Sequence, residues 1–207
     1  MKEEITSFAP GHLALGYICS KLSSKLLKVE VNLPLIFLFS VLPDIDIIIP
    51  QLNHRGPTHS TIVAFLFFIP FLIVYSKKSV PYLIALVQHS TIGDFFAGKT
   101  QILWPISIRY YGMDIPIDSP TNITVEWICF LISIVIMVKS NDLRKLFGKM
   151  NNLNLVLFIP TTAIFLPTLF SFPLKVPIEH LFPHIAYAAI FTTLIVKGLY
   201  EINIAKK

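Results

Sequence analysis

The chain has 207 residues, of which only 14% are charged and 54% are hydrophobic, with a net charge of +5. Because a soluble domain carries about 25% charged residues, this balance excludes a disordered chain, a nucleic-acid-binding arm and most soluble enzymes. The positive charge does not indicate nucleic-acid binding, since Lys and Arg occur in short clusters between apolar runs, as membrane topology requires.

The first predicted element is a helical hairpin. Val31–Leu42 is almost wholly apolar, but its length of about 12 residues is less than the roughly 17–25 that a membrane-spanning helix needs. We expect a re-entrant or protein-buried helix that ends at Leu42-Pro43-Asp44. The preceding helix, Gly11–Leu27, is predicted to be amphipathic, with Leu13, Leu15, Ile18 and Leu22 opposite Ser20, Lys21, Ser24 and Lys25.

Five later stretches are long enough, or nearly so, to cross a hydrocarbon core of about 30 Å as helices. They lack the period of two that strands show, and their internal prolines are tolerated in membrane bundles. The sequence therefore predicts an all-α, polytopic membrane helical bundle that forms one domain over residues 1–207, with its C-terminal helices in 153–200. The five predicted spans are Ser60–Ser76, Val80–Ala97, Thr121–Val138, Leu153–Phe172 and His184–Tyr200.

Clusters of Lys and Arg orient the predicted bundle. When the helices are threaded up and down, one side receives 12 of these residues and the other receives 4. Cytoplasmic loops carry the excess of Lys and Arg, so we expect the richer side to be cytoplasmic in an integral protein of the cell or inner membrane. The poorer side holds Arg55, Lys99, Arg109 and Lys175.

Nearly all residues capable of chemistry are predicted to lie on the non-cytoplasmic side. Imidazole and carboxylate groups are typical ligands of zinc and related ions, and ionisable groups within membrane segments are usually paired or functional. His89 and Asp94 are five residues apart and can share an ion only if the helix loosens, which Gly93 permits. We expect a divalent metal site on this side, drawn from His12, Asp44, Asp46, His54, His59, His89, Asp94 and Glu126.

Single members of this set also have structural interpretations. Asp44 and Asp46 follow Pro43 and suit a turn or an N-cap. A structural His89 and a buried Asp94, by contrast, would still need partners. The other structural roles open to single residues are a helix-start position for His12, a turn or helix cap for His54 and His59, an interfacial charge for Glu126, and interfacial positions for His180 and His184.

Several short motifs resemble the membrane-bound metal-dependent hydrolases of the YdjM type. The resemblance covers residues 10–127, and its most specific element is His-Arg-Gly-Pro-Thr-His-Ser at His54–Ser60. That family is distantly similar to zinc-dependent phospholipase C and to single-strand-specific nucleases, which bind three zinc ions in an all-helical fold. The other matching strings are Pro10–Gly16, Leu42–Asp46, His89 to Asp94 and Leu-Trp-Pro at Leu103–Pro105.

The resemblance implies metal ligands, but the sequence departs from the three-zinc pattern. Its His-x4-Asp replaces His-x3-Asp, and Asn122 stands where the pattern has the histidine that precedes Glu126. We therefore expect one or two ions, which by resemblance are of the zinc type. The residues that fall in the order of the pattern are His12, Asp44 or Asp46, His59, and His89 with Asp94.

The chemistry expected from such a site is hydrolysis. A bound metal lowers the pKa of water from about 15.7 to about 7. Asp44 or Asp46 would bridge ions or accept the proton, and Arg55 would bind phosphate oxygens. The sequence thus predicts a membrane-bound metal-dependent hydrolase of a lipid or lipid-linked phosphoester, with no nucleic-acid partner. A metal-ion carrier and a non-catalytic structural membrane protein are the alternatives.

Overall fold

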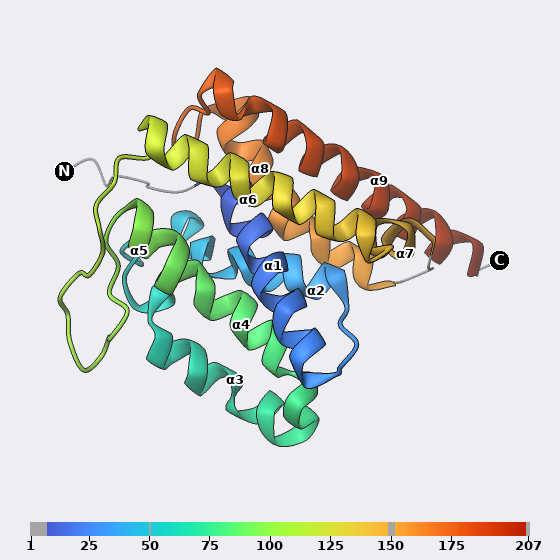
Figure 1. Ribbon diagram of the computed structural model, residues 1–207, viewed down its shortest axis with the longest axis horizontal. Coiled ribbons are helices and arrows are strands. Elements are labelled where there is room, and N and C mark those ends of the chain that lie inside the picture. The colour runs from blue at the N-terminus through green and yellow to red at the C-terminus, as the bar shows by residue number, and fades with distance from the viewer. Residues whose placement is uncertain (1–7, 50, 149–151, 206–207) are drawn as a thin grey trace.

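Helices make up most of the described chain, which in the computed structural model comprises residues 8–49, 51–148 and 152–205. One layer contains the long C-terminal helices, and a second layer, packed beneath it, contains the N-terminal helices (Figure 1). Within the second layer α1 packs against α2 and α4, while α3 lies on the outside against α4. The helices are α1 (Ala9–Leu27), α2 (Leu33–Val41), α3 (Thr61–Tyr75), α4 (Val80–Gln88), α5 (Asp94–Ala97), α6 (Pro120–Lys139), α7 (Asp142–Gly148), α8 (Phe158–Phe170) and α9 (Leu181–Ala205).

Four helical segments of the described chain are long and apolar enough to cross a membrane. Their outer surfaces carry large apolar side chains that the rest of the described chain leaves largely uncovered, such as Leu66, Ile73 and Leu169, which are 59%, 77% and 65% exposed. In water such a surface would be unfavourable, whereas in a bilayer it faces lipid chains. The all-α membrane bundle is therefore confirmed, with spans at Thr61–Lys78, Pro120–Lys139, Leu153–Phe170 and Ile178–Asn203.

The predicted span Val80–Ala97 is not among these four, which corrects the expected number of five. Two features distinguish Val80–Ala97 from the four spans. A π-helix, η4 (His89–Gly93), interrupts the segment after α4, and its polar side chains point into the protein. His89 and Asp94 are 0% and 2% exposed. A helix that buries such groups needs protein partners along its length, so it lies inside the bundle and not against lipid.

The first helix packs in a way that its amphipathic pattern alone does not reveal. In α1, Leu22 and Leu26 are 60% and 74% exposed, whereas Ser20 and Ser24 are buried. Small residues allow close helix packing: a Cβ atom added at Gly16 would lie 1.9 Å from Ser40 Oγ of α2. Ser20 Oγ also donates to the Pro81 carbonyl of α4 at 2.8 Å. In the second half of α1 the small serines therefore pack inward while Leu22 and Leu26 point outward, the arrangement found in membrane bundles, whereas Leu13 near the start of the helix is buried in the core.

The helix α2 is buried as expected, although the chain remains helical beyond Leu42. Asn32 caps it by accepting a hydrogen bond from the Leu35 amide, and Ile36 and Phe37 lie in the main core. After α2 the chain tightens into a 3-10 helix, η1 (Leu42–Ile48). The proline at position 43 explains the change, because it cannot donate the backbone hydrogen bond that continues an α-helix.

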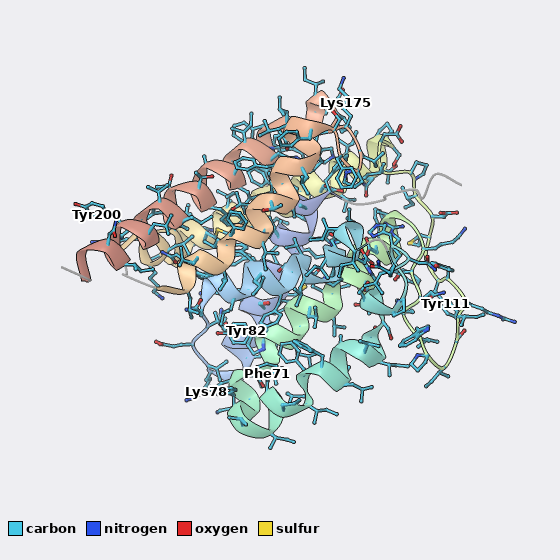
Figure 2. All side chains as sticks on the ribbon, turned by 180° about the vertical axis from the view of Figure 1, so that it is seen from behind. Phe71, Lys78, Tyr82, Tyr111, Lys175 and Tyr200 are labelled. Carbon is cyan, nitrogen blue, oxygen red and sulfur yellow. The ribbon has the colours of Figure 1, made fainter. Side chains whose placement is uncertain are left out.

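The two ends of the bundle match the partition of charges in the predicted threading. Figure 2 places Lys78 and Tyr200 toward one end of the molecule and Tyr111 and Lys175 toward the other. The loop between α5 and α6 extends from the second end (Figure 1). The assignment of the first end to the cytoplasm stays a prediction.

Candidate metal centre

Four separate segments bring the predicted chemistry-bearing side chains together near the start of α1. Asp44 and Asp46 lie on η1, and His59 ends a short 3-10 helix, η2 (Pro57–His59). His89 and Asp94 flank the π-helix η4, in which the Asp94 amide donates to the His89 carbonyl. This widened turn puts both side chains on one side of the helix, which ordinary α-helical spacing of five residues would not do.

The centre of the cluster consists of three ligand atoms at nearly equal separations, with a carboxylate oxygen of Asp44 close to two of them. His59 Nε2 and His89 Nε2 are 3.3 Å apart. Asp94 Oδ2 lies 3.1 Å from the first and 3.3 Å from the second, and Asp44 Oδ1 lies 3.4 and 3.3 Å from them. A tetrahedral ion with bonds of about 2.0–2.1 Å holds its ligand atoms about 3.3 Å apart. The three separations among His59 Nε2, His89 Nε2 and Asp94 Oδ2 therefore match one face of a tetrahedral zinc site, which leaves the fourth ligand position of such an ion for water.

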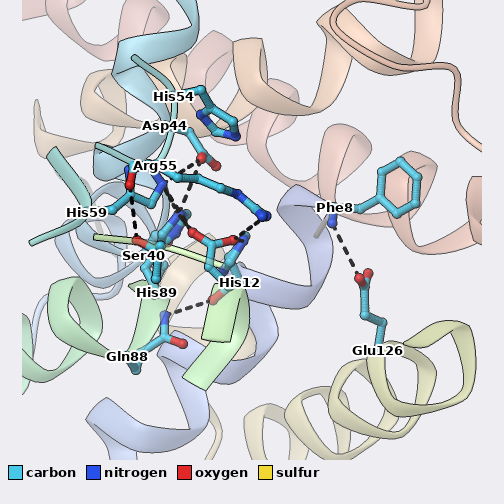
Figure 3. Close-up of polar contacts among 12 residues, drawn as sticks. Phe8, His12, Ser40, Asp44, His54, Arg55, His59, Gln88, His89 and Glu126 are labelled. Atoms are coloured by element: carbon cyan, nitrogen blue, oxygen red, sulfur yellow. Dashed lines mark hydrogen bonds and ion pairs between the residues drawn. The ribbon is translucent and has the colours of Figure 1, made fainter. Parts of the chain in front are cut away.

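Hydrogen bonds on the far side of each ring fix which nitrogen faces the centre (Figure 3). His89 Nδ1 lies 2.7 Å from the Ser40 carbonyl, which only accepts hydrogen bonds, so this nitrogen carries the proton. His59 Nδ1 lies 3.1 Å from Asp46 Oδ2, which also accepts from the Thr58 hydroxyl at 2.6 Å. In the neutral form of both rings, Nε2 therefore presents a lone pair to the centre. Such partners orient the ligands of metal sites.

The result is a buried concentration of hydrogen-bond acceptors. Two imidazole lone pairs and two carboxylate oxygens converge, and Asp94 Oδ2 has no hydrogen-bond donor among the described residues. Acceptors this close repel each other unless a cation lies between them. The donor set, its separations and the ring orientation thus fit a divalent metal ion of the zinc type.

The electrostatics of the cluster point the same way. Burial alone would raise the pKa of the Asp44 carboxyl and lower that of the His59 imidazole, since it disfavours both charged forms. Interaction outweighs burial: the charge on His89 and hydrogen bonds from both rings hold the pKa of Asp44 well below its usual range. Hydrogen bonds to Asp44, Asp46 and Asp94 raise the pKa of His59 well above its usual range. The site therefore attracts positive charge, for which protons and a metal ion compete.

Three more predicted residues surround this centre. Arg55 is 5% exposed, and its Nη2 donates to Asp94 Oδ1 at 3.2 Å. His12 stacks on His89 with ring centroids 3.7 Å apart, and its Nε2 lies 3.4 Å from Asp94 Oδ1. The glycine at position 93 makes room for this ring, since a Cβ there would lie 2.6 Å from it. His54 Nδ1 contacts Asp46 Oδ1 at 2.9 Å.

Glu126 is the one predicted ligand that the structure places apart from the cluster (Figure 3). Its Oε1 accepts from the Asn122 side chain at 2.9 Å and from the Phe8 amide at 3.3 Å, and its Oε2 lies 3.7 Å from His180 Nδ1. It belongs to none of the described groups of ligand atoms close enough to share an ion. The bundle places α6 beside the start of α1, on the side of Gly11.

Sequence reasoning did not single out two contributors. Thr58 lies within the His-Arg-Gly-Pro-Thr-His-Ser motif and gave a weak signal, whereas Ser40 contributes through its backbone carbonyl, for which no side-chain pattern exists. His180 and His184, interpreted as interfacial, are fully buried beside Phe8. Their burial corrects that interpretation.

The fold and this cluster define an integral membrane protein of bundled helices with a buried histidine–aspartate centre. The chain belongs to the YdjM inner membrane protein family, whose model matches residues 8–170. The match includes every residue of the cluster and continues through α8, beyond the motif-bearing part at 10–127. Comparison with curated proteins and with solved structures found no match.

Proposed function

We propose that this protein is a membrane-bound metal-dependent hydrolase that acts on a phosphoester of a lipid or lipid-linked substrate. The observation that carries the proposal is the triangle of ligand atoms from His59, His89 and Asp94, which fits three ligands of a tetrahedral ion and leaves its fourth position for water. An ion such as zinc, when bound there, supplies Lewis acidity that lowers the pKa of water to about 7.

A single ion suits this cluster better than two. Asp94 uses Oδ2 toward the two histidines, while its Oδ1 accepts from Arg55. A guanidinium is always charged, so it already provides a cation on the side of the carboxylate where a second metal ion would bind. His12, stacked on His89, supports the ring of that ligand and contacts Asp94.

The remaining residues divide into groups that contact substrate and groups that position ligands. The Asp44 side chain is 17% exposed, borders a cavity and has its Oδ1 within 3.4 Å of both histidine rings, so we assign it the role of accepting a proton from an attacking water. Arg55 borders the same cavity and suits phosphate oxygens, which guanidinium binds through paired hydrogen bonds. Asp46 has both oxygens engaged by His54, Thr58 and His59, so we assign it a positioning role in place of the catalytic role expected from the sequence.

The test is the metal content of the full-length protein purified in detergent, measured by mass spectrometry. We expect close to one zinc-type ion per chain and its loss in His59→Ala, because structural and catalytic zinc sites need their full ligand set. His184→Ala is the matched control: it removes an equally buried imidazole that lies outside the cluster. A metal content that is the same in His59→Ala as in the wild type would contradict the proposal.

Activity is tested on the same preparations with vesicles of lipid phosphodiesters. We expect release of the phosphate headgroup that a chelator abolishes, that His59→Ala lacks and that His184→Ala retains. Bound metal without turnover on any phosphoester would favour the carrier alternative, which metal flux into liposomes then tests directly. Absence of metal, turnover and flux together would leave the structural alternative.

A further inference from the structure

A cavity of about 240 Å³ adjoins the cluster. Its volume is far above the about 10–15 Å³ that one water molecule occupies on the same measure. Its polar lining is confined to one end, where Asp44, His54, Arg55 and Asp94 border it. The other walls come mainly from η1 and α8, with Phe8, Ala9, Val41, Pro173 and Leu174 at their edges, and among these lining residues Thr162 is the polar exception.

The cavity reaches the surface of the protein that faces lipid. The helix α8 belongs to the candidate span Leu153–Phe170. Residues from Phe158 to Pro167 of this helix line the cavity, a length of about 14 Å at the helical rise per residue. Phe158 and Ile159 are 67% and 40% exposed on the outside of the bundle. An occupant of the cavity would therefore be continuous with the hydrocarbon of the bilayer.

The lining favours a hydrocarbon chain over a peptide. A peptide segment needs hydrogen-bond partners for its amide and carbonyl groups when water is excluded. Away from the polar end, the only side-chain hydroxyl in the lining is that of Thr162, which already donates to the Phe158 carbonyl at 2.9 Å. An alkyl chain needs no such partners and gains free energy from burial.

We propose that this cavity binds the hydrocarbon chain of an alkyl phosphoester, with the phosphate at the end formed by Arg55 and the cluster. The inference rests on the proposed function for the reacting end and adds the part of the protein that selects the chain. The guanidinium of Arg55 at one end and an apolar wall along the rest match the phosphate and the alkyl chain of such a molecule. Ala163 of α8 and Ile48 of η1 belong to the two facing walls, so their size limits the chain that fits.

The test is photo-crosslinking of the purified full-length protein with dodecyl phosphate that carries a diazirine at the chain end. We expect labelled peptides from α8 and from Ile45–Ile48. Ala163→Phe fills the cavity and is expected to reduce this labelling about tenfold, which corresponds to a tenfold loss of affinity. Leu169→Phe is the matched control, since it adds a ring on the same helix at a position that does not line the cavity.

Competition experiments and a second cavity-filling variant complete the design. Unlabelled dodecyl phosphate is expected to compete, whereas butyl phosphate and inorganic phosphate are not. Should Ala163→Phe not fold, Ile48→Trp narrows the cavity from the opposite wall at a residue that is 60% exposed. Equal labelling of the wild-type and both filled variants, label spread evenly over the lipid-facing helices, or equal competition by inorganic phosphate would overturn the proposal.

The proposed function fails separately from this inference. Labelling confined to the cavity in a protein that holds no metal would leave the chain-binding site standing and refute the hydrolase. A metal-loaded, active protein whose labelling is the same in the cavity variants would support the hydrolase and refute the chain-binding site.

Discussion

Two buried polar clusters lie toward opposite ends of α1, and they differ in their balance of donors and acceptors. Toward the end of α1, Asp142 accepts a hydrogen bond from the Tyr17 hydroxyl at 2.9 Å and pairs with the Lys21 ammonium at 2.5 Å. Every charge there has a partner of the opposite kind. Near the start of α1, imidazole lone pairs and carboxylate oxygens face one another instead.

This difference separates structural from functional burial. A carboxylate paired with donors from its own chain is satisfied and holds α6 and α7 against α1. A set of converging acceptors is satisfied only by something that the chain does not supply, either protons or a metal ion. Both clusters contain buried charged groups, so burial and charge alone do not distinguish them. The match between hydrogen-bond donors and acceptors does.

Among changes that test this contrast between the two clusters, Asp94→Asn is expected to have the largest effect. This change keeps the shape of the side chain but removes one charged ligand of the cluster and the partner of Arg55. We expect the metal affinity to fall more than the about 10–100-fold that loss of a supporting residue costs. Isothermal titration with zinc after chelation measures it. An affinity within tenfold of the wild type would show that Asp94 is not a ligand.

A smaller change in metal affinity is expected from Asp46→Asn. Asp46 contacts the far nitrogen of His59 and not the centre, so its loss weakens the orientation and basicity of that ring. We expect zinc affinity to fall about 10–100-fold while stoichiometry is retained at saturating zinc. Complete loss of stoichiometric binding would instead make Asp46 a direct ligand and would redefine the centre.

The sequence predicted which residues meet in this cluster better than it predicted how they meet. The predicted set His12, Asp44, His54, His59, His89 and Asp94 does lie together, because alternating helices return these segments to one end of the bundle. The role of Asp46 did not follow from spacing, since Asp44 and Asp46 are equivalent until η1 sets their directions. The position of Glu126 also did not follow from spacing, because it depends on how α6 packs against α1.

The same distinction holds for the membrane helices. Hydropathy identified the four spans because exposure to lipid is a property of composition. It failed for Val80–Ala97 and for the face of α1, because both depend on contacts between helices: the polar interior that receives His89, and the close approach of Ser40 to Gly16. Such contacts are set by packing of small residues, which no single-segment pattern records.

The smallest effect is expected from a change in the other cluster, in which Asp142 is paired with donors. Asp142→Asn keeps a side chain that can bond the Tyr17 hydroxyl but removes the charge that pairs with Lys21. We expect a loss of about 1–3 kcal/mol in the free energy of unfolding, the range for an impaired buried polar partner, with metal content unchanged. Unfolding by denaturant in detergent measures the first quantity and mass spectrometry the second.

The pH dependence of that loss identifies its cause. Burial would raise the pKa of the Asp142 carboxyl, but hydrogen bonds from Lys21, Ser140 and Tyr17 and the charge of Lys21 lower it below its usual value. A carboxyl whose pKa is lower in the folded state stabilises the protein fully above its unfolded pKa of about 3.9, and the contribution disappears as the pH falls toward the folded pKa. The difference between wild type and Asp142→Asn should therefore be constant near neutrality and shrink below about pH 4. A difference that persists at low pH would assign the effect to packing and not to charge, and the donor–acceptor contrast between the two ends of α1 would lose its electrostatic basis.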